Sequence, residues 1–163
     1  MNIFLPDMRV NRIFDIDLAS LSLQGIEGLV FDLDNTLTPW HEYSPDEQVI
    51  KWFAALHEAG FKSCILSNSG ESKVSKINSW LKVPVIGNGA KPGKRGFLRA
   101  AEKLQLPPEK LAMVGDQLLT DVRGGNRCGF YTILTEPIAP GEFWWTKNVS
   151  RRLEKIIRKR LGL

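Results

Sequence analysis

The chain has 163 residues, of which 43% are hydrophobic and 25% charged, and its formal net charge is +4. That length suits one domain of ordinary size with its own core, and it excludes a second one. Residues 1–7 lack the basic start and apolar run of a signal peptide, and nowhere do roughly 18 apolar residues follow one another as in a membrane-spanning helix. We therefore expect a single domain in the cytoplasm, a compartment that also suits the widely spaced Cys64 and Cys128.

The positive charge is concentrated at the C-terminus. Residues 147–163 carry seven basic residues and one acidic residue, which gives this segment +6, so the first 146 residues carry −2 of the total of +4. The pI of about 9.2 is therefore a property of the terminal segment. Because the rest of the chain is slightly acidic, nucleic acid is not an expected partner of the main site.

Five short apolar runs have the composition of β-strands, and helical patterns lie between them. The runs cover residues 28–31, 62–66, 83–86, 111–114 and 130–134. The first helix is expected to have Ser44 as its N-cap and Pro45 at its first position, and to end at Gly60. Apolar residues at helical spacing indicate further helices at about 74–81, 97–104 and 120–128.

This alternation of strands and helices predicts an α/β fold. We expect a five-stranded parallel sheet, joined by right-handed crossovers and covered by helices on both faces, which is a three-layer Rossmann-like sandwich. The core of the domain should span about 28–135. It follows a lead-in, 1–27, whose packing the sequence leaves open, and precedes a basic helix at about 148–161.

Two carboxylates, Asp32 and Asp34, directly follow the first apolar run. Successive side chains of a strand point to opposite faces, so the two acids share one face while Leu33 turns away. At the carboxyl end of a parallel strand they would open into the crevice where such sheets bind ligands. Two anionic groups this close repel each other unless a cation lies between them, and Mg2+ is the natural candidate because it prefers oxygen ligands and phosphate partners. Taken alone, the pair could also be a surface turn.

Polar residues also follow the other predicted strands. Ser67 and Asn68 come just before a helix and offer a hydroxyl and backbone N–H groups to a phosphate. Lys91 can neutralise a transferring phosphoryl group as a point charge. Asp116 follows the fourth run, where it could complete the metal site, and Asp121 lies five residues further on.

This ordered set, DxDNT, then a serine, then a lysine, then GDxxxxD, resembles the haloacid dehalogenase (HAD) superfamily of phosphohydrolases over about residues 28–135. The resemblance implies a HAD-like fold and a Mg2+-dependent phosphatase. It implies that Asp32 attacks phosphorus and forms an aspartyl-phosphate, and that Asp34 protonates the leaving alcohol and then activates water. An aspartate at position 34 favours phosphatase or phosphomutase chemistry over dehalogenation or ion pumping.

The same resemblance implies roles for the remaining polar residues. The implied metal ligands are the side-chain carboxylates of Asp32 and Asp116 and the backbone carbonyl of Asp34. The implied phosphate contacts are Ser67, Asn68 and Lys91. Asp121 matches a supporting acid behind the metal ligands.

The spacing of these residues leaves no room for a cap domain. Between Asp34 and Ser67 lie 32 residues, and between Ser67 and Lys91 lie 23, which is enough for connecting helices alone. An open site suits a bulky substrate that itself excludes water, such as a protein, a nucleic acid, a lipid or a polysaccharide precursor. Trp40 and His41 lie where this superfamily places a small flap over the site. The sequence does not decide whether these two side chains contact the substrate or only pack against the protein.

Shorter segments narrow the resemblance. Residues 5–7 (LPD), 14–17 (FDID), 25–28 (GIEG) and 115–121 (GDQLLTD) look like the bacterial YqeG-type subfamily IIIA, which is similar to phosphatidylglycerophosphatases. This likeness implies a lipid phosphomonoester, phosphatidylglycerophosphate, as the expected substrate.

The basic C-terminal segment leaves two interpretations open. Apolar residues recur at helical spacing from Val149 to Ile157, which predicts a final helix docked on the sheet with a solvated basic face. Alternatively, the basic face binds anionic lipid at the inner surface of a membrane, with Trp144 and Trp145 as interfacial anchors. In that case the fold could also serve a non-catalytic or regulatory module that acts on a membrane, a ribosome or a nucleic acid.

Overall fold

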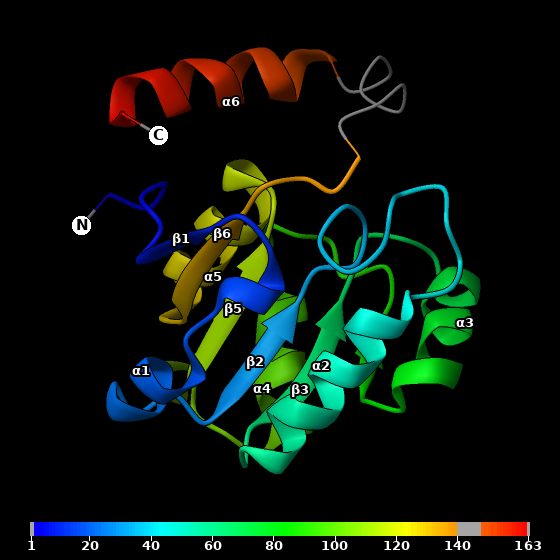
Figure 1. Cartoon of the computed structure of the whole chain (residues 1–163). Helices are drawn as coiled ribbons and strands as arrows, with labels where there is room; N and C mark the ends of the chain where they lie inside the picture. Colours follow the sequence, from blue (N-terminus) through cyan, green and yellow to red (C-terminus); the bar gives the residue numbers. More distant parts are fainter. Residues whose placement is uncertain (1, 140–147, 163) are drawn as a thin grey trace.

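The computed structural model of the protein describes residues 2–139 and 148–162, with the backbone alone for 148–151 (Figure 1). Trp144 and Trp145 therefore lie outside the described residues. Six parallel strands form one sheet, in the order β1-β6-β5-β2-β3-β4. The strands are β1 (Met8–Val10), β2 (Gly28–Phe31), β3 (Lys62–Leu66), β4 (Val85–Ile86), β5 (Leu111–Gly115) and β6 (Tyr131–Thr135).

Helices and short turns connect the strands. The helices are α1 (Leu18–Leu23), α2 (Glu47–Glu58), α3 (Glu71–Leu81), α4 (Lys94–Leu104), α5 (Arg123–Cys128) and α6 (Asn148–Leu161). Single turns are formed by η1 (Ile13–Asp15), η2 (Pro108–Lys110) and η3 (Leu118–Val122). Between β2 and β5 the chain holds only α2, β3, α3, β4, α4, η2 and loops, so this described stretch contains no cap domain.

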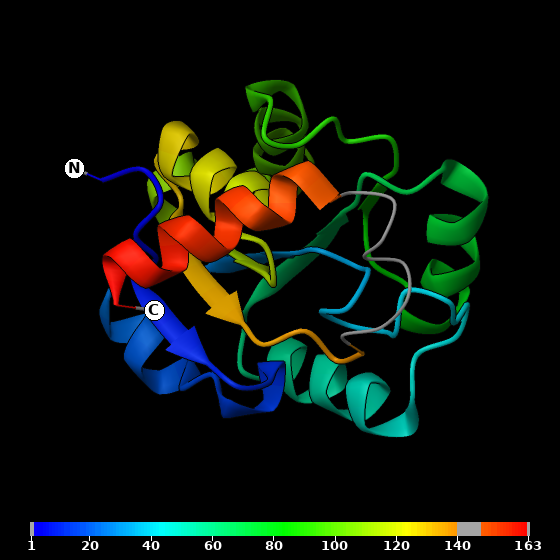
Figure 2. The ribbon, with the colours of Figure 1, turned by 90° about the horizontal axis from the view of Figure 1, so that it is seen from above.

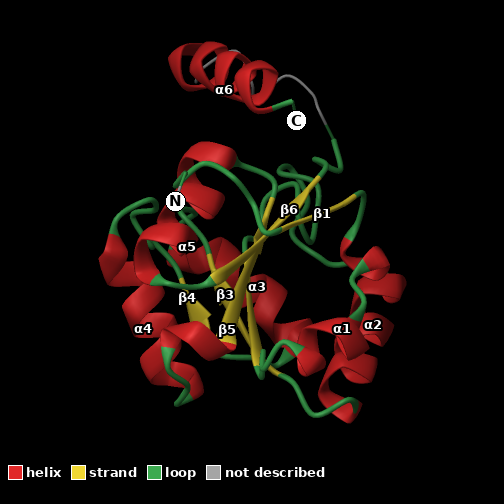
Figure 3. Cartoon of the chain, turned by 90° about the vertical axis from the view of Figure 1, so that its left-hand side faces the viewer, coloured by secondary structure: helices red, strands yellow, loops and turns green. Residues whose placement is uncertain are grey.

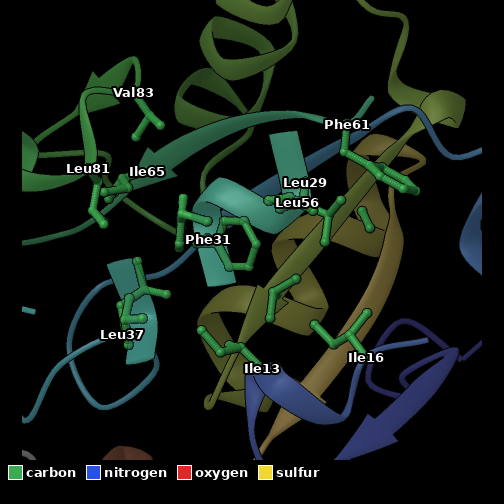
Figure 4. Packing of buried hydrophobic residues seen from close by; sticks show 14 of the residues in the cluster. Ile13, Ile16, Leu29, Phe31, Leu37, Leu56, Phe61, Ile65, Leu81 and Val83 are labelled. Carbon is green, nitrogen blue, oxygen red and sulfur yellow. The ribbon is translucent and has the colours of Figure 1, made fainter. Parts of the chain in front are cut away.

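The sheet is covered on both faces, as Figure 3 shows, which confirms the predicted three-layer α/β sandwich. Strand β2 explains how the layers are held, because its side chains alternate between two cores. Leu29 and Phe31 pack into the cluster under α1, α2 and α3 (Figure 4), while Val30 packs into the opposite cluster with Phe97 and Leu104 of α4. A strand buried on both faces reads as a continuous apolar run, which is why the sequence revealed it.

The structure has six strands where five were predicted, because the lead-in supplies β1. Met8 pairs with Ile133 and Val10 with Thr135 of β6. Asp7 fixes this register, since its N–H donates to the Thr132 carbonyl at 2.9 Å and its Oδ2 accepts from the Thr132 N–H at 2.8 Å. A three-residue edge strand has no periodicity of its own, so only its pairing partner defines it.

Two predicted helix starts also differ from the structure. Helix α2 is capped by Asp46, whose Oδ1 accepts from the Val49 N–H at 2.9 Å, so Ser44 and Pro45 lie before the helix. Both Ser and Asp are good N-caps, and the sequence does not decide between neighbouring candidates. The helix predicted at 120–128 begins instead with η3, a π-helical turn at Leu118–Val122 that continues into α5.

Helix α6 runs across the carboxyl ends of the strands, above β1 and β6 (Figures 1 and 2). Ile157 packs against Leu118, Val122 and Leu134, which docks the basic helix on the body of the protein. Of the helices in the described part of the chain, α6 included, none combines the length and apolarity needed to cross a bilayer.

Candidate active site

The polar residues singled out in the sequence meet at the carboxyl edge of the sheet. Because β2 lies between β5 and β3, the loops after these three strands are neighbours. Together with the loop after β4, which carries Lys91, they enclose a pocket of about 190 Å3, lined by Asp32, Asp34, Asn68, Ser69, Lys91, Gln117 and Thr120. The pocket lies where parallel α/β sheets bind ligands, beyond the ends of the strands.

Lys91 is the buried centre of the site. Its Nζ donates to Asp32 Oδ1 at 2.6 Å and to Asp121 Oδ1 at 2.7 Å, and only 2% of the lysine side chain is exposed. Burial lowers the pKa of Lys91, but the charges of Asp121 and Asp32 outweigh it and raise the pKa above its ordinary value. The ammonium therefore stays charged and provides a fixed positive group beside Asp32.

Asp121 is positioned by the glycine that ends β5. A Cβ on Gly115 would collide with the carboxylate of Asp121, so only glycine lets this acid lie against the strand end. The second oxygen of Asp121, Oδ2, accepts from the Gln117 N–H at 3.1 Å. Asp121 thus ties the loop after β5 to Lys91, and its supporting role behind the metal ligands stays a prediction.

Asp116 differs from the other acids of this network, because its carboxylate has no hydrogen-bond partner in the part of the chain that the structure describes. It is 3% exposed, and both of its carboxylate oxygens are buried without a hydrogen bond among the described residues. Burial, followed by the charges of Asp32 and Asp121, raises the pKa of Asp116 well above its ordinary value. A buried carboxylate without a donor is costly, so this position suits a bound cation.

The surrounding acids fit a divalent cation. One oxygen from each of Asp32, Asp116 and Asp121 lies within 4.8 Å of the others. Carboxylate oxygens are the ligands that Mg2+ prefers, and a cation between them would remove their mutual repulsion. Without it, burial raises the pKa of Asp32 to about 7, against the opposing effect of Lys91.

Asp34 lies beside Asp32 in the pocket and has its own partners. Its side chain is half-buried, and Oδ2 accepts from the Ser69 hydroxyl at 2.5 Å. Oδ1 accepts from Lys73 Nζ, and the same ammonium donates to the Trp40 carbonyl at 2.5 Å. Sequence reasoning missed Ser69 and Lys73, because a serine before a helix and a lysine in its first turn are typical of a cap and a solvated face.

Ser67 and Asn68 shape the loop after β3. Ser67 is fully buried behind the pocket, and its Oγ accepts from the Ser69 N–H at 3.0 Å. The Asn68 amide pairs with the backbone of Lys91, accepting from its N–H at 2.8 Å and donating to its carbonyl at 3.1 Å. The side chain of Asn68 therefore holds the Lys91 loop in place, and the phosphate contacts of Ser67 and Asn68 stay predictions.

The predicted flap residues lie at the border of the site. The ring centroids of Trp40 and His41 are 5.3 Å apart in an edge-to-face arrangement, and His41 is exposed. The Trp40 carbonyl connects this loop to Lys73, and through it to Asp34. Neither flap side chain is among those that line the pocket, so substrate contact by Trp40 and His41 stays a prediction.

A parallel sheet with a lysine and four aspartates at its carboxyl edge defines the class of HAD-like hydrolases, and comparison with known proteins agrees. A family model described as HAD-hydrolase-like matches residues 89–136. The cobalt-bound deoxy-D-mannose-octulosonate 8-phosphate phosphatase of Haemophilus influenzae superposes with a TM-score of 0.59 over 82% of this chain and 91% of that protein. At 14% identity this likeness concerns the fold alone.

Two sequence relatives define the family more closely. The probable phosphatase YqeG of Bacillus subtilis is 38% identical over 96% of this chain and 93% of that protein. The chloroplastic/mitochondrial phosphatidylglycerophosphate phosphatase 1 of Arabidopsis thaliana is 30% identical over 96% of this chain, which spans 47% of the plant protein. The chain belongs to this family of HAD-like phosphatases and is a phosphoric monoester hydrolase.

Proposed function

We propose that the chain is a Mg2+-dependent phosphatase that hydrolyses a lipid phosphomonoester through an aspartyl-phosphate on Asp32. The observation that carries the proposal is the position of Asp32, which lines the pocket between the ammonium of Lys91 and the unpartnered carboxylate of Asp116. A carboxylate there can act as a nucleophile, while the Lys91 ammonium, together with a cation held by Asp116, would spread the negative charge of the transferring group.

The reaction has two steps. In the first, an oxygen of Asp32 attacks phosphorus, the bond from phosphorus to the alcohol oxygen breaks, and Asp34 gives its proton to the leaving oxygen. In the second, Asp34 takes a proton from a water molecule that attacks the same phosphorus, which releases inorganic phosphate and restores Asp32. Ser69 and Lys73 orient Asp34 for both steps.

Several groups of the site would together stabilise the negative charge of the phosphoryl group. Lys91 supplies one fixed positive charge, which burial of its side chain shields from water. Mg2+, held by Asp32 and Asp116 with the Asp34 backbone carbonyl, would act as a Lewis acid on the phosphoryl oxygens. The first-turn backbone of α3, which follows Ser67 and Asn68, would bind the remaining phosphoryl oxygen.

The lipid substrate rests on two arguments. The relative from Arabidopsis is named a phosphatidylglycerophosphate phosphatase, which makes phosphatidylglycerophosphate the substrate of choice for this chain. The chain between β2 and β5 contains no cap domain, so a bulky head group can reach the pocket directly. Since such a substrate resides in a bilayer, the phosphatase would work at the surface of a membrane.

The test combines a variant with trapping of the intermediate. Replacing Asp32 with Asn removes the nucleophile at nearly constant volume, so phosphate release should fall to background while the circular dichroism spectrum is unchanged. Acid quenching during turnover of 32P-labelled phosphatidylglycerophosphate should leave label on the peptide that contains Asp32. Retention of most activity by Asp32→Asn would falsify the nucleophile assignment.

Substrate choice needs a separate measurement. Phosphate release should be compared over phosphatidylglycerophosphate, nucleotides, sugar phosphates and phosphopeptides at equal concentration. We expect the lipid phosphate to be hydrolysed with the highest kcat/KM. Comparable slow release from all of them would contradict the lipid substrate but leave the nucleophile assignment intact.

A further inference from the structure

Helix α6 and the pocket lie at the same edge of the molecule. The strands β2 and β3 point their carboxyl ends toward the side on which α6 runs, and from above the helix covers the β1 and β6 half of that edge (Figures 1 and 2). The pocket lies beside it, on the loops after β2, β3, β4 and β5. The helix and the pocket therefore lie on the same side of the molecule.

The inner side of α6 is fixed to the loop that carries Asp116. Glu154 Oε1 accepts from the Leu118 N–H at 3.1 Å, and Arg158 Nη2 donates to the Asp116 carbonyl at 3.2 Å. Ile157 adds apolar packing against Leu118, Val122 and Leu134. Glu154 lies one helical turn before Ile157 and Arg158, so the three residues share one side of α6 and hold the helix in one orientation.

The outer side of α6 has a different composition. We define the outer face as the exposed residues Arg152, Leu153, Lys155, Ile156, Lys159 and Arg160. It carries four positive charges, and Glu154, the acid of this helix, lies on the inner side. Half of the surface of Leu153 and of Ile156 is exposed, at 50% and 51%. Leu153 and Ile156 are three residues apart on the helix, so they form an adjacent exposed apolar pair between basic side chains rather than scattered single residues.

We infer that the outer face of α6 is a docking surface for an anionic lipid bilayer, and that it presents the pocket to phosphate groups in that bilayer. The basic residues complement anionic head groups, and their long stems allow Leu153 and Ile156 to enter the interface. A nucleic acid would use the charges but gain nothing from the two aliphatic side chains. The inference rests on the proposed lipid substrate and names the surface through which the enzyme reaches it.

The experiment uses the full chain and phosphatidylcholine vesicles with or without phosphatidylglycerol. Wild-type protein should cosediment with the anionic vesicles and be released by high salt. Changing Arg152, Lys155 and Lys159 to Gln should weaken partitioning about hundredfold, because one basic residue near an anionic surface contributes about fivefold. Changing Leu153 and Ile156 to Ser should weaken it about tenfold, in proportion to their half-exposed surface.

The matched control changes three exposed basic residues elsewhere, Arg99, Lys103 and Arg127, to Gln. This control has the same loss of charge, and its partitioning should stay within about twofold of wild type, as an exposed site away from the contact contributes little. Turnover should be measured on phosphatidylglycerophosphate in vesicles and on soluble p-nitrophenyl phosphate. The ratio of the two rates should fall in the outer-face variants and stay constant in the control.

The outcomes separate the docking surface from the proposed function. Equal partitioning of the outer-face variant and the control overturns the docking surface, as does binding of single-stranded RNA by the outer face without binding of vesicles. Vesicle binding that depends on the outer face, together with hydrolysis of neither phosphomonoester, supports the docking surface and overturns the proposed function. Circular dichroism and thermal unfolding of each variant identify any that fail to fold, and the aliphatic pair then tests the surface independently of the basic residues.

Discussion

Replacing Lys91 with Met should destabilise the protein severely, because it leaves two buried acids without their cation. Lys91 is 2% exposed, and its partners Asp32 and Asp121 are 8% and 1% exposed. Removing one partner of a buried ion pair costs about 3–5 kcal/mol, and here one lysine serves two carboxylates. Methionine has nearly the length of the lysine stem, so the loss reports charge rather than a cavity. We expect the free energy of unfolding to fall by about 4 kcal/mol.

Urea unfolding followed by circular dichroism measures this loss, with EDTA present so that metal binding does not contribute. The matched control is Lys73→Met, which breaks the pair with Asp34. The side chains of that pair are 11% and 25% exposed, so the expected loss is about 1 kcal/mol. The double variant Lys91→Met/Asp121→Asn should recover about 2 kcal/mol, because one unpaired charge is gone. A loss for Lys91→Met no greater than that for Lys73→Met would refute the reasoning.

Three further predictions concern the loop after β5. Chelation with EDTA should abolish turnover and Mg2+ should restore it, and activity that survives chelation counts against the metal site. Asp116→Asn should weaken Mg2+ binding, measured by calorimetry, at least about tenfold, because the variant loses a charged ligand. Gly115→Ala places a Cβ against the Asp121 carboxylate, so it should lower the free energy of unfolding by about 2 kcal/mol. Urea unfolding measures this loss, and an unchanged midpoint would show that the loop rearranges to accommodate the methyl group. Arg158→Ala removes the donor to the Asp116 carbonyl, so calorimetry should show weaker Mg2+ binding, which Arg158→Lys should partly restore. Equal Mg2+ affinity of the wild type and both variants would show that this hydrogen bond does not position Asp116.

The sequence was sufficient for features that depend on local composition. The apolar runs predicted β2, β3 and β5 because strands buried on both faces must be apolar throughout. The acids that follow β2 and β5, and the lysine that precedes α4, were predicted to share one site because the ends of parallel strands meet at one edge. The structure brings Asp32, Asp34, Lys91, Asp116 and Asp121 together there.

The partners of these residues depend on contacts between distant parts of the chain, so the sequence could not give them. Lys73 meets Asp34 only because α3 packs beside the loop after β2, and no helical pattern separates such a lysine from a solvated one. Strand β1 exists only where β6 offers it an edge, since three residues carry no periodicity.

The sequence alone thus determined which polar residues meet and on which edge of the sheet they lie, because strand composition and residue order are local properties of the chain. Tertiary packing alone decided that Asp116 is left without a donor, that Lys91 joins two acids, and that the inner side of α6 holds the Asp116 loop while its outer face stays exposed. These features arise from the burial of charges and from contacts across many residues, and both are properties of the folded protein rather than of any segment.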